Sequence, residues 1–185
     1  MKKIYILSDA HLGSWAIEHR RTHERRLGSF LDKIKNDAAA VYMLGDMFDF
    51  WYEFKNVVPK GYTRFFGKVA ELTDNGVEVH FFTGNHDIWC LDYFEKECGM
   101  VIHREPCLVE LYGKEVFLAH GDEFSTEKGF RILRAMFTTA SCNGCCQCYT
   151  PVGVYGLVIS GPTTVCSSIR SMVRHHIWVK TRRTV

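Results

Sequence analysis

The sequence predicts an α/β fold with a mostly parallel sheet, and two observations carry this prediction. Four near-continuous apolar runs are typical of buried strands, and stretches with helical periodicity separate the first three of them. Strands that alternate with helices form βαβ units, in which the strands lie parallel. The four runs, each followed at once by polar or acidic residues, are 4-IYILSDAHLG-13, 41-VYMLGDMFDF-50, 79-VHFFTGNHD-87 and 116-VFLAHGDE-123.

Helical spacing of apolar residues predicts two amphipathic helices, in the stretches 16–36 and 62–76. The pair Asn75-Gly76 is expected to end the second helix. A third, short helix over 91–98 is expected to end at Gly99, and 107–120 is expected to form a hairpin that turns at 112–114. The apolar stripes of the two long helices are Leu27, Phe30, Leu31 and Ile34 in the first, and Phe65, Phe66, Val69 and Leu72 in the second.

Composition places the chain among ordinary globular proteins, with 46% hydrophobic and 24% charged residues in a length of 185. The apolar run near the N-terminus is too short for a signal peptide, so we expect a cytoplasmic protein that is able to touch a membrane surface. The net charge of +2 conceals an asymmetry, because residues 128–185 contain no acidic residue at all. A basic segment of this kind indicates affinity for nucleic acid or membranes, or a defect in the segment itself.

Polar clusters follow all four predicted strands, and the loops beyond strand C-termini meet at one edge of a parallel sheet. Each member has an ordinary explanation when it is taken alone, such as a helix cap, a turn residue or a structural histidine. Several carboxylates cannot share one site without a strong positive charge, however, because like charges raise each other's pKa. Mixed Asp, His and Asn donors suit Mn²⁺, Mg²⁺ or Fe²⁺, and the absence of a thiolate among them disfavours structural zinc. The clusters are Asp9 and His11, then Asp46 and Asp49, then Asn85, His86 and Asp87, and finally His120 and Asp122.

The segments 9-DAH-11, 45-GDMFD-49, 84-GNHD-87 and 120-HGD-122 resemble the calcineurin-like metallophosphoesterases. The resemblance runs from residue 1 to about residue 137. It implies a metallophosphoesterase-type β-sandwich of mixed sheets flanked by helices, with a metal site at the C-terminal ends of the strands. Three further stretches look most like the branch of that family that hydrolyses UDP-2,3-diacylglucosamine in lipid A synthesis, and these are 8-SDAHLG-13, 44-LGDMFDFWYEF-54 and 130-FRILRAMF-137.

The resemblance also implies a role for each site residue and a reaction. Two Mn²⁺ ions, or Mg²⁺ or Fe²⁺, would activate water to attack the α-phosphorus of a UDP-linked lipid, giving UMP and 2,3-diacylglucosamine 1-phosphate. Asp9 and His11 would hold one ion, Asp46 would bridge both, and Asn85 and His120 would hold the second. His86 would lie beside the reacting phosphate, and Asp49 and Asp87 would orient the ligands.

Two other functions remain open at this point: a phosphoesterase for nucleotides or other phosphoesters, and a non-catalytic metal-binding module on the same fold. We expect no nucleic-acid partner and predict no protein partner, whereas contact with the inner-membrane surface is compatible with a lipid substrate. The aromatic residues 48–54 are expected to pack mainly beneath the site, with contact to acyl chains or uracil as the alternative. The arginines of the first helix are expected to be solvated, with contact to anionic lipid as the alternative.

One block of the family pattern is absent. The family closes its site with G-H-x-H, and the nearest candidate here, 175-HH-176, has neither the glycine nor the spacing. When codons for residues 138–185 are read one base earlier, permitted third bases give a continuation that resembles the family. We therefore hypothesise a metallophosphoesterase core over 1–137, incomplete at its C-terminus, followed by an aberrant tail over 138–185 that is out of frame. The alternative is a divergent native tail with surplus cysteines, of which 142-CNGCCQC-148 has spacing compatible with zinc.

Reading the coding DNA across the codons for Phe137 and Thr138 tests this hypothesis. We expect that restoring one base after the Phe137 codon opens a longer frame that encodes a G-H-x-H block downstream. A stop codon in the shifted frame before any such block would show that the tail is native.

Overall fold

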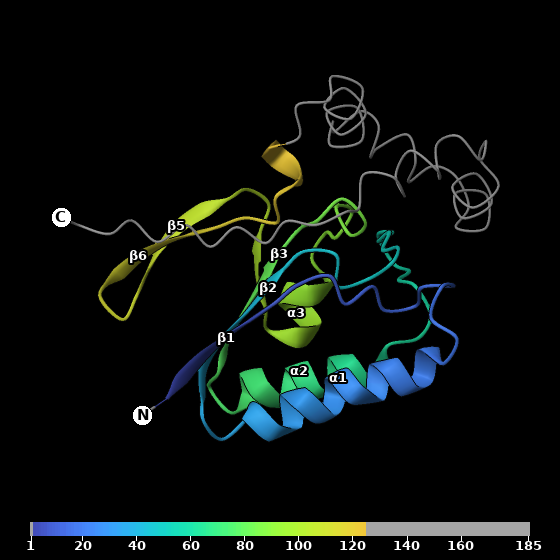
Figure 1. Ribbon diagram of the computed structural model, residues 1–185. Helices are drawn as coiled ribbons and strands as arrows, with labels where there is room; N and C mark the ends of the chain where they lie inside the picture. The colour runs from blue at the N-terminus through green and yellow to red at the C-terminus, as the bar shows by residue number, and fades with distance from the viewer. Residues whose placement is uncertain (1, 125–185) are drawn as a thin grey trace.

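Four short parallel strands form the central sheet of the computed structural model, which describes residues 2–124 (Figure 1). The strands lie in their sequence order: β1 (Lys3–Leu7), β2 (Ala38–Leu44), β3 (Glu78–Phe82) and β4 (Val101–His103). A separate antiparallel hairpin follows, made of β5 (Cys107–Leu111) and β6 (Lys114–Leu118). The predicted α/β class with mixed sheets is therefore confirmed.

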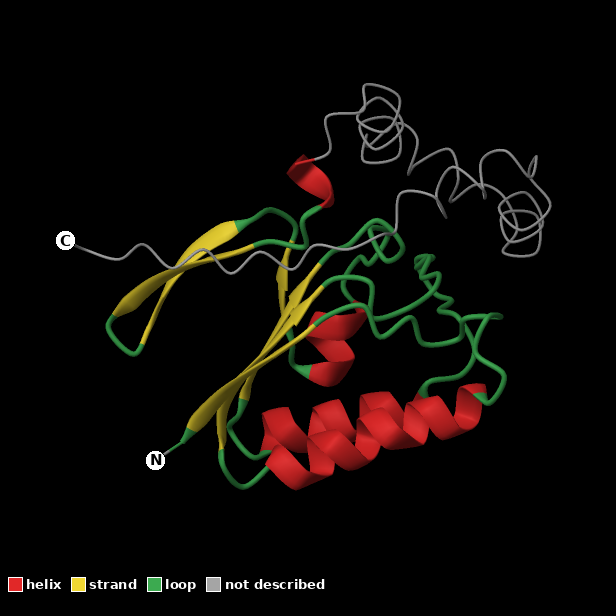
Figure 2. Cartoon of the chain, viewed as in Figure 1, coloured by secondary structure: helices red, strands yellow, loops and turns green. Residues whose placement is uncertain are grey.

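Three helices lie on one side of the central sheet, away from the hairpin (Figure 2). They are α1 (Arg20–Ile34), α2 (Thr63–Asp74) and α3 (Tyr93–Cys98), and a 3₁₀ turn over Asp122–Phe124 follows the hairpin. Both predicted stop signals act as expected: Asn75 and Gly76 follow α2, Gly99 follows α3, and the two glycines take φ of +75° and +65°. A left-handed residue lets the chain leave a helix at low cost when that residue is glycine.

Alternation along the strands sends side chains into two cores. On one face of β2 and β3, residues such as Val41, Met43 and Phe81 point to the helices and join the main core. On the opposite face, residues such as Tyr42 and Phe82 point to the hairpin and form a smaller core with it. β2 is buried on both faces along almost its whole length, which is why its sequence is a continuous apolar run.

The predicted hairpin over 107–120 is confirmed, because β5 and β6 pair antiparallel around the turn after Leu111. The fourth apolar run, residues 116–118, therefore lies in this hairpin and is not part of the parallel sheet. The place beside β3 is taken instead by β4, a strand of three residues that is too short to produce a periodic signal. The end of β6 still brings His120 to the edge where the parallel strands end, because His120 Nδ1 donates a hydrogen bond to the Leu44 carbonyl.

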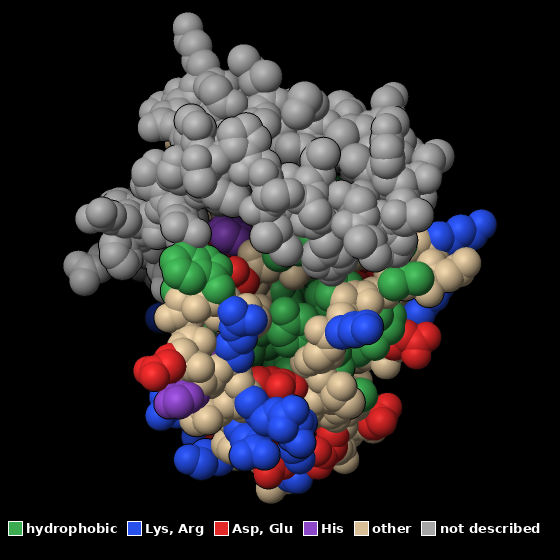
Figure 3. Space-filling model, turned by 90° about the vertical axis from the view of Figure 1, so that its right-hand side faces the viewer, with side chains coloured by type: hydrophobic (Ala, Val, Ile, Leu, Met, Phe, Trp, Pro, Cys, Tyr) green, Lys and Arg blue, Asp and Glu red, His purple; other side chains and the backbone are tan. Residues whose placement is uncertain are grey.

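The surface carries both charged and apolar patches. Figure 3 shows apolar side chains gathered in a hollow between basic ones on one face. Ion pairs join α1 to α2, with 2.8 Å from Lys35 to Glu71 and 2.8 Å from Lys68 to Asp32.

Within residues 2–124, no helix has the length and apolar character needed to cross a membrane. The hypothesised boundary at residue 137 and the tail over 138–185 lie outside the described residues.

A histidine pair between the sheet and the hairpin predicts a pH-dependent stability. His80 Nδ1 lies 3.1 Å from His103 Nε2, a hydrogen-bond distance between the two rings. Burial, and then His80, lower the pKa of His103 below its usual 6.5. The unfolded chain therefore binds a proton at His103 more readily, and the free energy of unfolding should fall as the pH drops below 6.5. Other groups that face the pair are Tyr42, Glu78 and Cys107.

Chemical denaturation of the wild type and of His103→Gln, at several pH values on either side of 6.5, checks this expectation. The difference in free energy of unfolding between the wild type and His103→Gln should narrow in acid. Only the wild type loses the stability that comes from the lowered pKa of His103. Subtracting the two curves removes the titration of groups that both proteins share. Parallel curves would show that the pair has no role in acid stability.

Candidate metal centre

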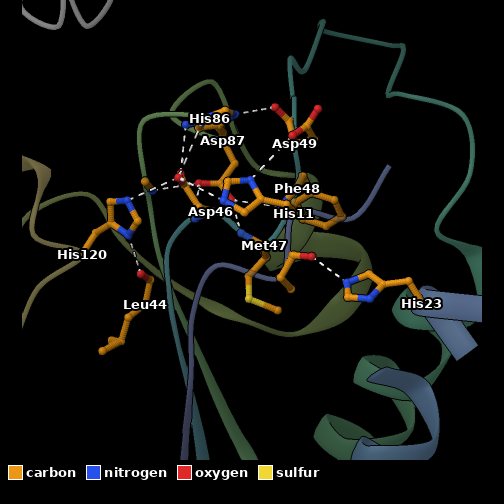
Figure 4. A network of polar contacts seen from close by, with 12 residues as sticks. His11, His23, Leu44, Asp46, Met47, Phe48, Asp49, His86, Asp87 and His120 are labelled. Carbon is orange, nitrogen blue, oxygen red and sulfur yellow. Dashed lines mark hydrogen bonds and ion pairs between the residues drawn. The ribbon is translucent and has the colours of Figure 1, made fainter. Parts of the chain in front are cut away.

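The predicted site residues from four separate loops lie close together at the C-terminal edge of the sheet (Figure 4). The loop after β1 supplies Asp9 and His11, and the loop after β2 supplies Asp46. The loop after β3 supplies His86, and the loop after β6 supplies His120. Parallel strands point the same way, so their following loops converge, and the hairpin delivers the fourth loop from above the sheet.

Asp46 is at the centre of this cluster and is 0% exposed. Its Oδ1 accepts a hydrogen bond from the backbone N–H of His86 at 3.0 Å. Its Oδ2 is buried and has no hydrogen-bond partner. Three imidazole nitrogens surround that oxygen instead, at distances of 3.5 Å for His120 Nε2, 3.9 Å for His11 Nε2 and 4.0 Å for His86 Nε2.

Two of these rings are held by backbone carbonyls on their far side. His86 Nδ1 donates to the carbonyl of Asp49 at 2.6 Å, and His120 Nδ1 donates to that of Leu44 at 2.8 Å. A ring whose Nδ1 carries the proton keeps a lone pair on Nε2 when it is neutral. This is the arrangement in which histidines bind metals, with the other N–H anchored on a carbonyl.

The spacing of the donor atoms fits divalent ions. Distances of 3.5–4.0 Å are too long for hydrogen bonds. They are close to the separation of two ligands that each lie about 2.1 Å from one shared ion. The donors fall into two groups that share Asp46, one with His11 and His86 and the other with Asp9 and His120. A shared carboxylate between two ligand groups is what a bridging ligand requires.

The electrostatics of the cluster show how strongly it favours positive charge. Burial alone would raise the pKa of Asp46, but the nearby imidazoles, that of His120 above all, outweigh it and hold that pKa below its usual value. Burial would likewise lower the pKa of His120, yet Asp46 raises it to about 10. A proton on His120 thus supplies part of the charge that a bound cation would supply.

Asp87 connects the loop after β2 with the loop after β3. Its carboxylate accepts backbone N–H groups from Gly84 at 2.7 Å and from Met47 at 2.9 Å, with longer contacts to the amides of Asp46 and Phe48. Burial, and then the charge of Asp46, raise the pKa of Asp87 to about 7. Asp87 therefore contacts the backbone of the ligand loops and not the space between the imidazoles.

The other predicted residues are placed as follows. Asp49 Oδ1 lies 3.7 Å from His11 Nδ1, and the Asp49 carbonyl anchors His86. Asn85 is half-buried in the loop between Gly84 and His86. Asp122 begins the 3₁₀ turn after His120. The roles that the resemblance assigns to these residues remain predictions.

The backbone at the site is strained. Asp9, His11 and Asp46 all adopt left-handed conformations, with φ of +53°, +43° and +53°. Non-glycine residues pay an energetic cost for this conformation, and such residues cluster at functional sites. Close packing adds a second constraint, because a Cβ on Gly84 would lie 2.2 Å from Asp46 Oδ1. No periodic pattern in the sequence predicts either feature.

Sequence reasoning missed two residues that hold the ligand loops. His23 on α1 donates through Nε2 to the carbonyl of Ala10 at 2.7 Å, between the predicted ligands Asp9 and His11. Glu53 accepts hydrogen bonds from the loop after β3. Neither residue belongs to a polar cluster at a strand end, so the pattern that identified the site gave no signal for them.

The aromatic run 48–54 divides between two clusters. Phe48 and Trp51 are fully buried in the main core beneath the site, as expected. Tyr52 and Phe54 form a small separate cluster with Phe50 and Trp89.

Comparisons with known proteins give a consistent result. The sequence profile described as calcineurin-like phosphoesterase matches residues 2–141. A UDP-2,3-diacylglucosamine hydrolase of Porphyromonas gingivalis is 57% identical over 121 residues, covering 65% of this chain and 46% of the relative. Proteins of the same name from Aeromonas salmonicida and Neisseria gonorrhoeae are 35% and 32% identical, over 70% and 69% of this chain and 49% and 51% of the relatives. The chain thus spans about half the length of the curated relatives it matches.

A solved structure of a protein of unknown function from Aquifex aeolicus matches with a TM-score of 0.44 and 19% identity. The match covers 75% of this chain and 74% of that one.

Replacing Gly84 tests how closely the two central loops must approach. We expect Gly84→Ala to weaken Mn²⁺ binding by at least about tenfold, because the added methyl group displaces the Asp46 carboxylate that both ligand groups share. Isothermal titration calorimetry with Mn²⁺ measures the change. Gly67→Ala is the matched control, since a Cβ at this helical position meets nothing within 4 Å. Equal Mn²⁺ affinity in the two variants would contradict the central position of Asp46.

Proposed function

Because the chain belongs to the calcineurin-like phosphoesterase family, we propose that it is the metal-dependent hydrolase part of an enzyme for UDP-2,3-diacylglucosamine. The products would be UMP and 2,3-diacylglucosamine 1-phosphate. The observation that carries the substrate is the 57% identity to a hydrolase of that name. The carboxylate oxygen of Asp46, surrounded by imidazole nitrogens, supports the hydrolytic chemistry.

The proposed ions are two Mn²⁺, with Mg²⁺ or Fe²⁺ as chemically similar substitutes. When bound, such ions stabilise charge on phosphoryl oxygens and lower the pKa of water so that it can act as a nucleophile. The buried, unpartnered Oδ2 of Asp46 supports its role as the bridging ligand. The proposed ligands are Asp9, His11, Asp46, Asn85 and His120.

His86 is proposed to act on the substrate. The Asp49 carbonyl occupies its Nδ1, so His86 presents only Nε2 to the site. Protonated at Nε2, His86 would donate a hydrogen bond to a phosphoryl oxygen and stabilise the negative charge that grows there in the transition state. Unprotonated, the same atom is a metal ligand, and its position 4.0 Å from Asp46 Oδ2 suits that role too. The variant His86→Ala separates the two roles.

Asp49 and Asp87 are proposed to orient these groups and to make no contact with substrate. Asp87 supports this through its hydrogen bonds to the amides of Met47 and Gly84, which fix the two central loops relative to each other. Removing such supporting groups in metal sites commonly costs about 10–100-fold in affinity or activity.

We further propose a cytoplasmic location with peripheral contact to the inner membrane, because the substrate is a lipid. Four arginines on α1 are exposed and available to anionic headgroups, namely Arg20, Arg21, Arg25 and Arg26. The division into a core over 1–137 and an out-of-frame tail over 138–185 also remains a proposal.

Hydrolysis assays with Mn²⁺ on UDP-2,3-diacylglucosamine test the proposed function, with the Porphyromonas gingivalis enzyme and an aryl phosphodiester assayed alongside. We expect His86→Ala to lower turnover by about 10²–10³-fold, the effect of losing one transition-state donor, while Mn²⁺ affinity is kept. His19→Ala, an exposed histidine at the start of α1, is the matched control.

Two outcomes would contradict these assignments. Loss of Mn²⁺ from His86→Ala would make His86 a ligand and not the phosphate-binding group. Hydrolysis of the aryl diester without hydrolysis of the UDP-lipid would keep the phosphoesterase and reject the substrate.

A further inference from the structure

Two oppositely charged side chains outside the ligand set hold one peptide segment between them. The segment is 90–93, which follows the loop that carries His86 and leads into α3. Glu53 is only 3% exposed, and its carboxylate accepts backbone N–H groups from Leu91 at 2.7 Å and from Asp92 and Tyr93 at 2.8 Å each. A buried carboxylate is tolerated when backbone donors satisfy it in this way.

Arg104 holds the same segment by its carbonyl oxygens. Its Nη1 donates to the Cys90 carbonyl and its Nη2 to the Leu91 carbonyl, both at 2.8 Å. Arg104 directly follows β4, so its backbone is fixed to the sheet. Glu53 thus binds the N–H groups and Arg104 the C=O groups of one short stretch of chain. Hydrogen bonds to charged groups are stronger than those between neutral groups.

This segment is connected to the metal centre through backbone hydrogen bonds. The amide of Trp51 donates to the His86 carbonyl and that of Glu53 donates to the Trp89 carbonyl, each at 3.0 Å. Between these two bonds, Tyr52 and Trp89 form an isolated parallel β-bridge that joins the loop after β2 to the loop after β3. The two hydrogen bonds connect the backbone of His86, whose imidazole faces Asp46, with the backbone of Glu53.

We propose that Glu53 and Arg104 are positioning residues for the metal centre. By fixing residues 90–93, they keep the loop after β3 against the loop after β2, so that His86 Nε2 faces Asp46. Neither residue touches the space between the imidazoles. This inference rests on the proposed function only in an experiment that measures hydrolysis. Hydrogen exchange and Mn²⁺ binding test it independently.

The alternative is that Glu53 does no more than cap α3, and Glu24 provides a matched comparison. The Glu24 carboxylate accepts the N–H groups of Arg64 at 3.0 Å and Phe65 at 3.3 Å at the start of α2. Glu24 therefore has the same chemistry at another helix N-terminus, without a contact to the loop after β3. Glu53→Gln and Glu24→Gln each replace one acceptor oxygen by an amide donor and keep the side-chain volume.

Hydrogen exchange on the metal-free protein gives the decisive measurement. We expect Glu53→Gln to accelerate amide exchange through the whole stretch 84–93, including the site loop, and Glu24→Gln to accelerate it only near the start of α2. Acceleration confined to 91–98 in Glu53→Gln would show a helix cap and overturn the proposal. Arg104→Gln, at an exposed position, should accelerate the same stretch and provides the test should Glu53→Gln not fold.

Calorimetry with Mn²⁺ adds a functional readout. We expect Glu53→Gln to bind Mn²⁺ about 10–100-fold more weakly than the wild type, whereas Glu24→Gln binds as the wild type does. Equal weakening in both variants would indicate general destabilisation and overturn the positioning role. A wild type that binds Mn²⁺ but leaves UDP-2,3-diacylglucosamine intact would reject the proposed substrate and leave this inference standing.

Discussion

The buried carboxylate of Asp46 is the group around which the rest of the site is arranged. An isolated charge in a protein interior is costly, and this one is tolerated because a backbone amide satisfies one oxygen and three imidazoles surround the other. Its position requires left-handed backbone at Asp46 and a glycine at residue 84. The local strain is sustained by the strands on either side, whose apolar side chains fill both cores.

The architecture explains how candidate metal ligands far apart in sequence come within a few ångströms of one another. β1, β2 and β3 are parallel and adjacent, so the loops after them open at one edge. The hairpin packs on the opposite face from the helices, and the end of β6 carries His120 over that edge to the Leu44 carbonyl. The parallel sheet and the hairpin thus both contribute to one cluster of candidate metal ligands.

Buried carboxylates beyond the ligands share one physical role, which is to bind backbone amides. Asp87 fixes the loops after β2 and β3 near their origins, and Glu53 fixes the far end of the second loop. Loops are ordinarily the most mobile parts of a fold, whereas metal ligands must be held to within a fraction of an ångström. Charged hydrogen bonds to the backbone supply that rigidity without adding regular secondary structure.

The sequence by itself determined the strands, the helices, their stop signals and the residues that gather at the edge of the sheet, because burial imposes periodicity and strand ends expose polar loops. Tertiary structure alone decided three things: that the predicted hairpin stands apart from the parallel sheet, that three-residue β4 completes that sheet, and that His23, Glu53 and Arg104 hold the loops. These depend on contacts between residues distant in sequence. A local sequence pattern does not predict such contacts, because a charged residue looks the same in the sequence whether its side chain faces solvent or binds a buried amide.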